Sequence, residues 1–515
     1  MRLASVGFGW LLLASAGFAD VRLPAIFGDR MVLQQGIPAP VWGWAAAGER
    51  VTVSVADQSK TATAGADGRW RVALDPLKPG DPVEMIVAGK NTITLKDVLV
   101  GEVWIGSGQS NMFFPLEKAA NGPREVADAA FPAIRLFSVK MTIADEPKDD
   151  TEGSWSPCTP ETAKSFSAVA YFFGRELHRT LNVPVGLIHC SWGGSPAEAW
   201  TSRETLEGDA DFRPILERWR EAVEDAAGCK ATHERRLKEW KAAVEKAKAE
   251  KSQLPTEPAL LGPKGPFPHH QPVGLWNGMI RPVAPFAIRG AIWYQGETNG
   301  ARGRGYQYRK LFPAMIGDWR RLWGEGDFPF LFVQLANFHD PDPGPVDSLW
   351  AELREAQLLT LKASPNTGMA VIIDIGDAQD IHPVNKQDVG KRLALSALTG
   401  TYGKSVVGSG PIYESMAAEG GGIRLKFKHI GGGLEAKGGP LKGFAVAGDD
   451  RKFVWAVAAI DGGTVVVSSP NVPKPAAVRY AWADNPAGCN LYNQEGLPAS
   501  PFRTDDWPGL SDKNR

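Results

Sequence analysis

The segment Val103-Trp104-Ile105-Gly106-Ser107-Gly108-Gln109-Ser110-Asn111-Met112 joins an apolar run to a polar, glycine-rich turn. The apolar half predicts a buried strand, and later runs of the same kind alternate with helical stretches. These later runs cover residues 185–188, 290–293, 330–333 and 370–373. Continuous apolar strands between helices are typical of a parallel sheet covered on both faces. We therefore expect an α/β domain whose active site lies at the carboxyl ends of the strands.

The character of the sequence changes on both sides of this region. Residues 20–97 alternate apolar and polar residues between Gly-Asp, Asp-Gly and Pro-Gly pairs, which predicts a small β-sandwich. Residues 408–515 are again strand-like and dense in glycine, which predicts a second β-rich module. The α/β catalytic domain then covers residues 98–407. A charged insertion with helical period at about 208–270 predicts a solvated helical hairpin, more typical of a surface insertion than of a lid.

The N-terminus has the pattern of a secretory signal peptide. Arg2 precedes an apolar run, and small residues follow up to Ala19. A membrane anchor is the alternative, but the run is short for crossing a bilayer. We expect residues 1–19 to be removed and the protein to be exported to the periplasm or outside the cell, with no stable membrane insertion.

Composition limits the classes of function. A length of 515 residues suggests roughly two to four domains. The formal net charge of −1 argues against a nucleic-acid partner. The 18 Trp residues mainly predict core packing, but flat aromatic faces also suit sugar rings. The four cysteines contain no C-x-x-C pair, so both disulfides and free thiols stay open. The pair His269-His270 has no further metal ligands at suitable spacing.

Ser110 is the candidate nucleophile. A serine between a strand and a helix is exposed at the rim of the sheet, where helix N–H groups can bind an oxyanion. The surrounding pattern differs from the Gly-x-Ser-x-Gly elbow of α/β-hydrolases. Serine is also a good helix cap, so a purely structural role is the alternative for this residue alone.

His382 is the candidate base. It follows the last expected strand, in Asp380-Ile381-His382-Pro383, and a serine nucleophile needs a histidine within hydrogen-bond reach. The histidine needs an acid that fixes its tautomer, and Asp374, Asp377 and Asp380 all lie in this loop. An acid-rich surface loop with a capping histidine is the alternative.

Two more polar motifs follow buried strands. Gln295, Glu297 and Asn299 belong to the run Trp-Tyr-Gln-Gly-Glu-Thr-Asn, and Gly194 ends the run Ser-Trp-Gly-Gly. A buried polar cluster and a tight turn are the structural alternatives. Together, however, the four strand ends supply a nucleophile, a base, acids and hydrogen-bond donors at one rim.

These motifs, in this order, resemble the sialate O-acetylesterase family within the broader SGNH-hydrolase class. The resemblance extends over nearly the whole chain after residue 19. The matching stretches are residues 106–112, 166–168, 171–174, 191–194, 276–280, 293–297, 381–383, 392–394, 491–493 and 501–505.

The resemblance implies a flavodoxin-like three-layer α/β/α domain with added N-terminal and C-terminal β modules. It implies Ser110 as nucleophile, His382 as base, an acetylated sugar or glycan as substrate, and no metal or other cofactor. The backbone N–H groups of Ser110 and Gly194, with the side chain of Gln295 or Asn299, would bind the oxyanion.

The acid is where this sequence departs from the pattern. The broader class places it three residues before the histidine, and Gln379 occupies that position. Asp380 is the first replacement. Glu297 is the second, because related carbohydrate esterases use a glutamate in this motif, and Asp377 stays open as well.

The substrate also stays open at this stage. O-acetylated sialic acid is favoured, and its carboxylate would require an arginine such as Arg302 or Arg304. Acetylated xylan or another plant or microbial polysaccharide is the alternative. A non-catalytic carbohydrate-binding protein is the second alternative, and the intact serine and histidine argue against it.

Overall fold

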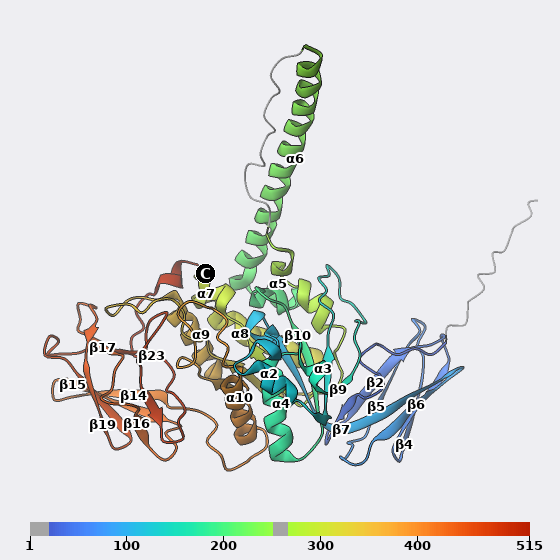
Figure 1. The fold of residues 1–515 in the computed structure, drawn as a ribbon, viewed down its shortest axis with the longest axis horizontal. Helices are drawn as coiled ribbons and strands as arrows, with labels where there is room; N and C mark the ends of the chain where they lie inside the picture. The colour runs from blue at the N-terminus through green and yellow to red at the C-terminus, as the bar shows by residue number, and fades with distance from the viewer. Residues whose placement is uncertain (1–19, 251–265, 515) are drawn as a thin grey trace, which may run out of the picture.

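The computed structural model describes residues 20–250 and 266–514, so the expected signal peptide lies outside the described residues. Figure 1 shows a central α/β region with β-rich regions at its two ends, the N-terminal one in blue and the C-terminal one in red. The molecule is thus a mixed α/β protein with a largely parallel central sheet and additional antiparallel sheets.

The central sheet has the strand order β13-β12-β11-β7-β10-β8-β9. The pairs from β13 to β8 are parallel, and β9 runs antiparallel to β8. The bounds are β7 Thr92–Gly108, β8 Phe131–Ser138, β9 Ser156–Cys158, β10 Val185–Ser191, β11 Gly290–Tyr294, β12 Phe330–Val333 and β13 Thr367–Ala370.

Helices cover both faces of this sheet, as alternation along β11 demonstrates. Trp293 packs in one core with Trp319 of α8, whereas its neighbour Ile292 packs in a second core with Phe173 of α4. Successive strand residues point to opposite faces, so each core is one face of the sheet. The helices are α1 Ser110–Phe113, α2 Gly122–Ala127, α3 Pro160–Ala163, α4 Ala168–Leu181, α5 Arg203–Glu207, α6 Arg213–Glu250, α7 Glu297–Ala301, α8 Gly305–Trp323, α9 Leu349–Ala363 and α10 Lys386–Gly400.

The apolar runs predicted as strands lie in β7, β10, β11, β12 and β13, with one correction. Residues 371–373 are buried but lie beyond the end of β13. The last residue of β12, Val333, pairs with Ala370, so no partner strand is left for the residues that follow. The chain therefore leaves the sheet three residues earlier than predicted and begins the loop that carries His382.

Strand β7 connects the N-terminal sheets to the central sheet. Its first part pairs with β1 and β6, and its second part pairs with β10 and β11. The expected boundary between residues 97 and 98 therefore falls inside one continuous strand. The other N-terminal strands are β1 Val32–Gln34, β2 Ala39–Trp44, β3 Arg50–Val55, β4 Gln58–Thr63, β5 Arg69–Leu74 and β6 Val83–Ala88.

The C-terminal region consists of antiparallel sheets with the orders β14-β15-β20-β19, β18-β17-β21-β23 and β16-β22. Their bounds are β14 Ile412–Glu419, β15 Gly422–Lys428, β16 Leu434–Ala436, β17 Phe444–Ala447, β18 Val454–Trp455, β19 Val457–Asp461, β20 Thr464–Ser468, β21 Ala477–Tyr480, β22 Leu491–Asn493 and β23 Phe502–Arg503.

The insertion differs from the predicted hairpin. Its described part contains one 38-residue helix, α6, which stands out from the body of the molecule (Figure 1). Ion pairs one turn apart, such as Arg220–Glu224 and Lys230–Glu234, favour an uninterrupted helix. The hairpin expected within residues 213–252 is therefore wrong, since α6 runs through residues 213–250 without a turn. Most of the Pro-rich stretch that follows, residues 251–265, lies outside the described residues.

Two further expectations concern export and cysteines. Within residues 20–250 and 266–514, no helix is long and apolar enough to cross a membrane. Cys158, Cys190, Cys229 and Cys489 are all free thiols, which decides the question that the sequence left open.

Candidate active site

Ser110 begins α1 two residues after β7 ends at Gly108, at the carboxyl edge of the sheet. The turn needs glycine at residue 108, where φ is +137° and a Cβ would lie 2.1 Å from the carbonyl oxygen of Tyr294. The turn therefore packs closely against the end of β11, and this packing orients the residues that follow, including Ser110. The local sequence thus places the Ser110 hydroxyl at the rim.

The structure brings His382 and Asp380 to this serine. The Nε2 atom of His382 lies 2.8 Å from Ser110 Oγ, and its Nδ1 atom lies 3.3 Å from Asp380 Oδ1. The same carboxylate oxygen accepts the backbone N–H of His382 at 2.8 Å. Asp380 therefore holds both the backbone and the imidazole ring of the histidine.

The other acids of this loop have different partners. Asp377 Oδ1 accepts the backbone N–H groups of Gln379 and Asp380, so it shapes the turn in front of the histidine. Asp374 forms a two-pronged ion pair with Arg392 of α10. Among the three aspartates, Asp380 is the one that faces the imidazole.

Glu297 forms no hydrogen bond or ion pair with His382 among the described residues, so Asp380, the first of the two expected acids, is the one beside the imidazole. Its Oε1 atom accepts from Asn111 Nδ2 at 2.5 Å, and its Oε2 atom has no hydrogen-bond partner among the described residues. Burial raises the pKa of this carboxyl group above its usual range. Glu297 therefore contacts Asn111, the residue after the nucleophile, and does not contact His382, the residue that it was expected to support.

Asn111 and Lys386 complete this buried cluster. Lys386 Nζ donates to Asn111 Oδ1 at 2.5 Å, and burial lowers the pKa of this lysine to about 7. Asn111 Nδ2 also donates to the backbone oxygen of Ile381 at 3.0 Å. One amide side chain thus ties the residue after the nucleophile to the residue before the histidine.

The side chains of Gln295 and Asn299 donate within a buried network, whereas the sequence predicts one of them as an oxyanion donor. Gln295 Nε2 donates to Asn299 Oδ1 at 2.7 Å and to the backbone oxygen of Ser195 at 3.2 Å. Asn299 Nδ2 donates to Glu198 at 2.9 Å. Both side chains are fully buried in this network, because the Ser195–Glu198 segment folds against them from about 100 residues away in the sequence.

Backbone groups remain as donors beside Ser110. Within the described part of the chain, the N–H groups of Ser110 and Gly194 have no hydrogen-bond partner. Gly193 packs against the nucleophile, since a side chain there would come within 3.4 Å of Ser110 Cβ. Gln109, which the sequence reasoning missed, also has an unpartnered Nε2 atom within residues 20–250 and 266–514, while its Oε1 accepts from Thr298 N. The signal was an amide residue directly before the serine.

A basic cavity of about 330 Å³ lies beside this rim, and we call it the arginine pocket. Its polar lining consists of Glu198, Arg218, His270, Arg302 and Arg304. Arg304 pairs with Glu198 at 2.6 Å, and Arg302 Nη2 donates to His270 Nδ1 at 2.7 Å. Arg218 Nε is buried without a hydrogen-bond partner in the described structure. Arg218 Nη2 donates to Gln307 Oε1 at 3.1 Å. The lining therefore contains three arginines and one carboxylate, which is paired with Arg304.

The arginine pocket reaches the oxyanion side of the nucleophile. The His270 imidazole lies against the backbone of Gly194, and burial together with the Arg302 charge lowers the pKa of His270 to about 4. A neutral His270 adds no positive charge of its own. Burial and the neighbouring Arg304 charge lower the pKa of Arg302 as well, as expected where positive charge is in excess. The lining of the arginine pocket thus carries more positive than negative charge.

The adjacent histidines pack rather than form a metal centre. His269 stacks on Trp192 with ring centroids 5.8 Å apart, and His270 accepts from Arg302. The described residues contain no group of three or more His, Cys, Asp or Glu side chains that could hold a metal ion.

Known proteins resemble this chain over nearly its full length. Residues 274–399 match the family described as "Carbohydrate esterase, sialic acid-specific acetylesterase". The sialate O-acetylesterase of Rattus norvegicus is 32% identical over 538 residues, covering 95% of this chain and 94% of the rat protein. The Homo sapiens sialate O-acetylesterase is 30% identical, covering 96% and 95%. The crystal structure of a carbohydrate acetylesterase from Xanthomonas citri superposes with a TM-score of 0.80 at 39% identity, covering 95% of this chain and all of that one.

Proposed function

Because the chain belongs to the sialate O-acetylesterase family of carbohydrate esterases, we propose that it hydrolyses O-acetyl esters of sialic acids with Ser110 as nucleophile. The observation that carries this proposal is the chain of contacts from Ser110 Oγ to His382 Nε2 and from His382 Nδ1 to Asp380, at 2.8 and 3.3 Å. Such a chain of nucleophile, base and acid is the arrangement that acyl transfer requires.

In the first half of the cycle, Ser110 Oγ attacks the acetyl carbonyl carbon while His382 Nε2 takes the hydroxyl proton. Negative charge develops on the carbonyl oxygen, and the N–H groups of Ser110 and Gly194 are the donors that support it. Asp380 stabilises the imidazolium that forms and holds its Nδ1–H in place. The C–O bond to the sugar then breaks, and His382 gives its proton to the leaving sugar oxygen.

In the second half, water replaces the sugar. His382 accepts a proton from the water as the water oxygen attacks the acetyl carbon bound to Ser110. The same N–H groups support the second oxyanion, and loss of one such donor typically costs roughly 10²–10³ in rate. Collapse returns the proton from His382 to Ser110 Oγ and releases acetic acid, which ionises at neutral pH.

The fold supports the finer assignment to the flavodoxin-like SGNH hydrolases. Helices lie on both faces of the central parallel sheet, and Ser110 follows the carboxyl end of β7. Ligand sites at the carboxyl ends of parallel strands are the rule for open α/β sheets. We likewise keep residues 1–19 as a signal peptide, which a mature N-terminus at Asp20 in the exported protein would support.

The arginine pocket favours a sialic acid over a neutral acetylated sugar such as acetylxylan. A sialic acid carries a carboxylate, and the pocket offers an arginine with an unpartnered Nε atom and a surplus of positive charge. A charge-assisted hydrogen bond to such a group is worth about 1.5–3 kcal/mol. Acetylxylan has no matching charge and would leave the surplus positive charge of the pocket without an anion.

Rates on two substrates test both parts of the proposal. We expect acetate release from O-acetylated N-acetylneuraminic acid to exceed release from acetylxylan, and p-nitrophenyl acetate to be turned over because it needs only the nucleophile and base. Absence of turnover on all three substrates would instead favour a non-catalytic carbohydrate-binding protein.

A pair of arginine variants isolates the pocket. Arg218→Met should raise KM for the acetylated sialic acid roughly 10–100-fold, the equivalent of one charge-assisted bond. Arg220→Met is the matched control, because Arg220 lies on the same helix with a side chain 66% exposed. Equal losses for the two variants, or an equal loss on sialic acid and p-nitrophenyl acetate, would contradict a carboxylate-binding role.

A further inference from the structure

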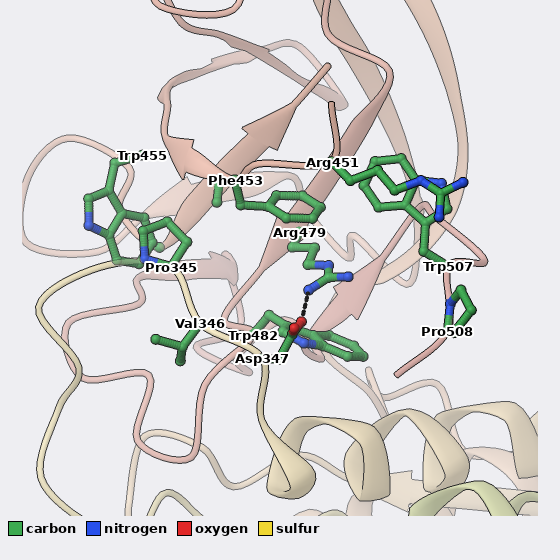
Figure 2. A pocket seen from close by; sticks show the side chains of 12 residues that line it. Pro345, Val346, Asp347, Arg451, Phe453, Trp455, Arg479, Trp482, Trp507 and Pro508 are labelled. Carbon is green, nitrogen blue, oxygen red and sulfur yellow. Dashed lines mark hydrogen bonds and ion pairs between the residues drawn. The ribbon is translucent and has the colours of Figure 1, made fainter. Parts of the chain in front are cut away.

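A second cavity, of about 400 Å³, lies between the C-terminal sheets and the loop of residues 337–348 that precedes α9 (Figure 2). We call it the aromatic cleft. It contains neither Ser110 nor His382, and no step of the proposed reaction uses it. The residues that border it include Asp347, Arg451, Phe453, Trp455, Arg479 and Trp507.

Several aromatic rings border the cleft and keep part of their surface open. Trp455 of β18 is 50% exposed, an unusual state for so large an apolar side chain. Phe453 and Trp507 are half-buried, with ring centroids 5.7 Å apart. In Figure 2 Trp455 stands at one end of the cleft and Trp507 at the other, with Phe453 between them. Flat rings in such a row present faces against which the C–H faces of sugar rings can pack.

Arg479 holds the floor of the cleft rigid. Its guanidinium pairs with Asp347 at 2.8 Å and with Asp505 at 3.0 Å. It also lies over the rings of Phe453 and Trp482, at 4.1 and 5.1 Å from their centroids. Asp347 belongs to the loop and Asp505 to the C-terminal region, so this arginine joins the two walls. A ligand would therefore meet a largely preformed surface, which lowers the entropic cost of binding.

Arg451 gives the cleft a charge preference. Its guanidinium lies 5.2 Å from the Trp507 ring centroid, and it forms no ion pair with any acid in residues 20–250 and 266–514. The charged lining contains two arginines and one aspartate, and that aspartate is already paired with Arg479. One positive charge remains for an anionic group that lies against the aromatic rings.

The cleft continues along the loop toward the active site. A neighbouring cavity of about 330 Å³ shares Trp455 and Trp482 with it and extends to Pro341 and Asp342. Asp340, the residue before Pro341, accepts a hydrogen bond from Gln379 at 2.9 Å. Gln379 belongs to the loop that carries His382. The same loop thus borders the cleft and contacts the residues beside the base.

We propose that the aromatic cleft binds an acidic saccharide unit of a larger glycan, separately from the acetylated sugar at Ser110. Trp455, Phe453 and Trp507 contact the sugar faces, and Arg451 pairs with a carboxylate such as that of a sialic acid. The cleft would then hold a sialylated chain on the enzyme while one of its sugars is deacetylated. Binding at this site needs no hydrolysis, so its test stands apart from the role of Ser110.

Calorimetric titration with sialyllactose and with lactose tests the proposal. Sialyllactose carries no O-acetyl group, so it is not consumed, and an Arg218→Met background weakens competing binding at the arginine pocket. In that background we expect sialyllactose to bind more tightly than lactose. Trp455→Ala should weaken sialyllactose binding at least about tenfold, the equivalent of 1.4 kcal/mol. Trp455→Phe, which keeps an aromatic face, should retain most of it.

Two further variants make the outcome specific. Arg451→Gln should reduce sialyllactose binding to the level of lactose and leave lactose binding unchanged. Val457→Ala is the control, because Val457 is 70% exposed two residues after Trp455 and does not line the cleft. Unchanged affinity in both Trp455→Ala and Arg451→Gln would overturn the proposal, as would an equal loss in Val457→Ala. A failure of the proposed reaction would appear elsewhere, as turnover by Ser110→Ala.

Discussion

Two polar groups lie on either side of the turn at Ser110, and they differ in almost every physical property. On the open side, the side chains of His382 and Asp380 are 36% and 61% exposed. His382 contacts Ser110, and Asp380 contacts His382. On the closed side, Asn111, Glu297 and Lys386 are fully buried and contact one another. Asn111 and Glu297 belong to the same kind of strand-end motif as Ser110 and His382, so motif membership alone does not assign chemistry.

The difference lies in what each group can do during a reaction. Exposed groups at the rim can exchange protons with substrate and water. The buried group cannot reach substrate, but it bonds to the residue after Ser110 and to the residue before His382. We therefore expect the open side to determine the rate of chemistry, and the closed side to determine how well the serine and histidine are held together.

Ser110→Ala should give the largest effect. Removal of the nucleophile is expected to lower kcat/KM by roughly 10⁴–10⁶ on p-nitrophenyl acetate and on O-acetylated sialic acid. The free energy of unfolding should stay within about 0.5 kcal/mol of wild type, because the side chain is small and partly exposed. Turnover assays and urea unfolding measure the two quantities.

Ser107→Ala is the matched control in the same motif. Ser107 Oγ is buried on β7 with no hydrogen-bond partner within the described chain, so its loss removes no contact. We expect near wild-type turnover and equal or slightly higher stability. Similar losses in the two serine variants would mean that the turn, rather than the Ser110 hydroxyl, is what the substitution damages.

A comparison of kcat in Asp380→Asn and Glu297→Gln tests the open side against the closed side. Asp380→Asn should lower kcat roughly 10²–10⁴-fold, because the imidazole loses the charge that stabilises its protonated form. Glu297→Gln should lower it less than about tenfold, since an amide can still accept from Asn111 and the carboxyl group does not touch His382. The reverse ranking of kcat values would move the catalytic acid to the buried side.

The sequence alone predicts those site residues that follow directly from the positions of the strand ends. Apolar runs predict β7, β10, β11 and β12. Because parallel strands place their carboxyl ends at one edge, the sequence also predicts that Ser110 and His382 lie close together. The family resemblance and the esterase class are confirmed by full-length relatives. The acid stayed open, with Asp380 placed before Glu297 and Asp377, because the conformation of the loop before His382 decides which aspartate faces the imidazole.

The burial of polar side chains could not be predicted from the sequence. In the sequence, Gln295 and Asn299 look like free hydrogen-bond donors. In the structure they donate to Ser195 and Glu198, which lie about 100 residues earlier in the chain. The arginine pocket likewise needs Arg218, which lies on a helix that reads from sequence as a solvated surface insertion. Hydrogen-bond partners so distant in sequence leave no local pattern, and only the packed structure reveals which polar groups are already occupied.

Asn111→Ala should have an intermediate effect that joins the two sides. The amide donates to Glu297 and to Ile381 O, and it accepts from Lys386, so its loss leaves buried groups without partners. We expect a loss of about 1–3 kcal/mol in the free energy of unfolding. We also expect a fall of roughly 10–100-fold in kcat, because a small misplacement of reacting groups has effects of this size. Loss of stability with unchanged kcat would reduce Asn111 to a purely structural residue.

Lys386→Met should have the smallest effect on turnover and a distinctive effect on the pH dependence of stability. Burial lowers the pKa of Lys386 from 10.5 to about 7, so above pH 7 the folded protein releases a proton that the unfolded chain still binds. The unfolded state then binds more protons, and the free energy of unfolding rises with pH by at most about 1.4 kcal/mol per pH unit. Urea unfolding between pH 7 and 9 should show this rise in wild type and a smaller one in Lys386→Met. Lys391→Met, an exposed lysine on the same helix α10, should behave like wild type. If all three proteins show the same slope, the lysine keeps its proton throughout this range, and the closed side is an ion pair with Glu297 rather than a cluster that loses its charge.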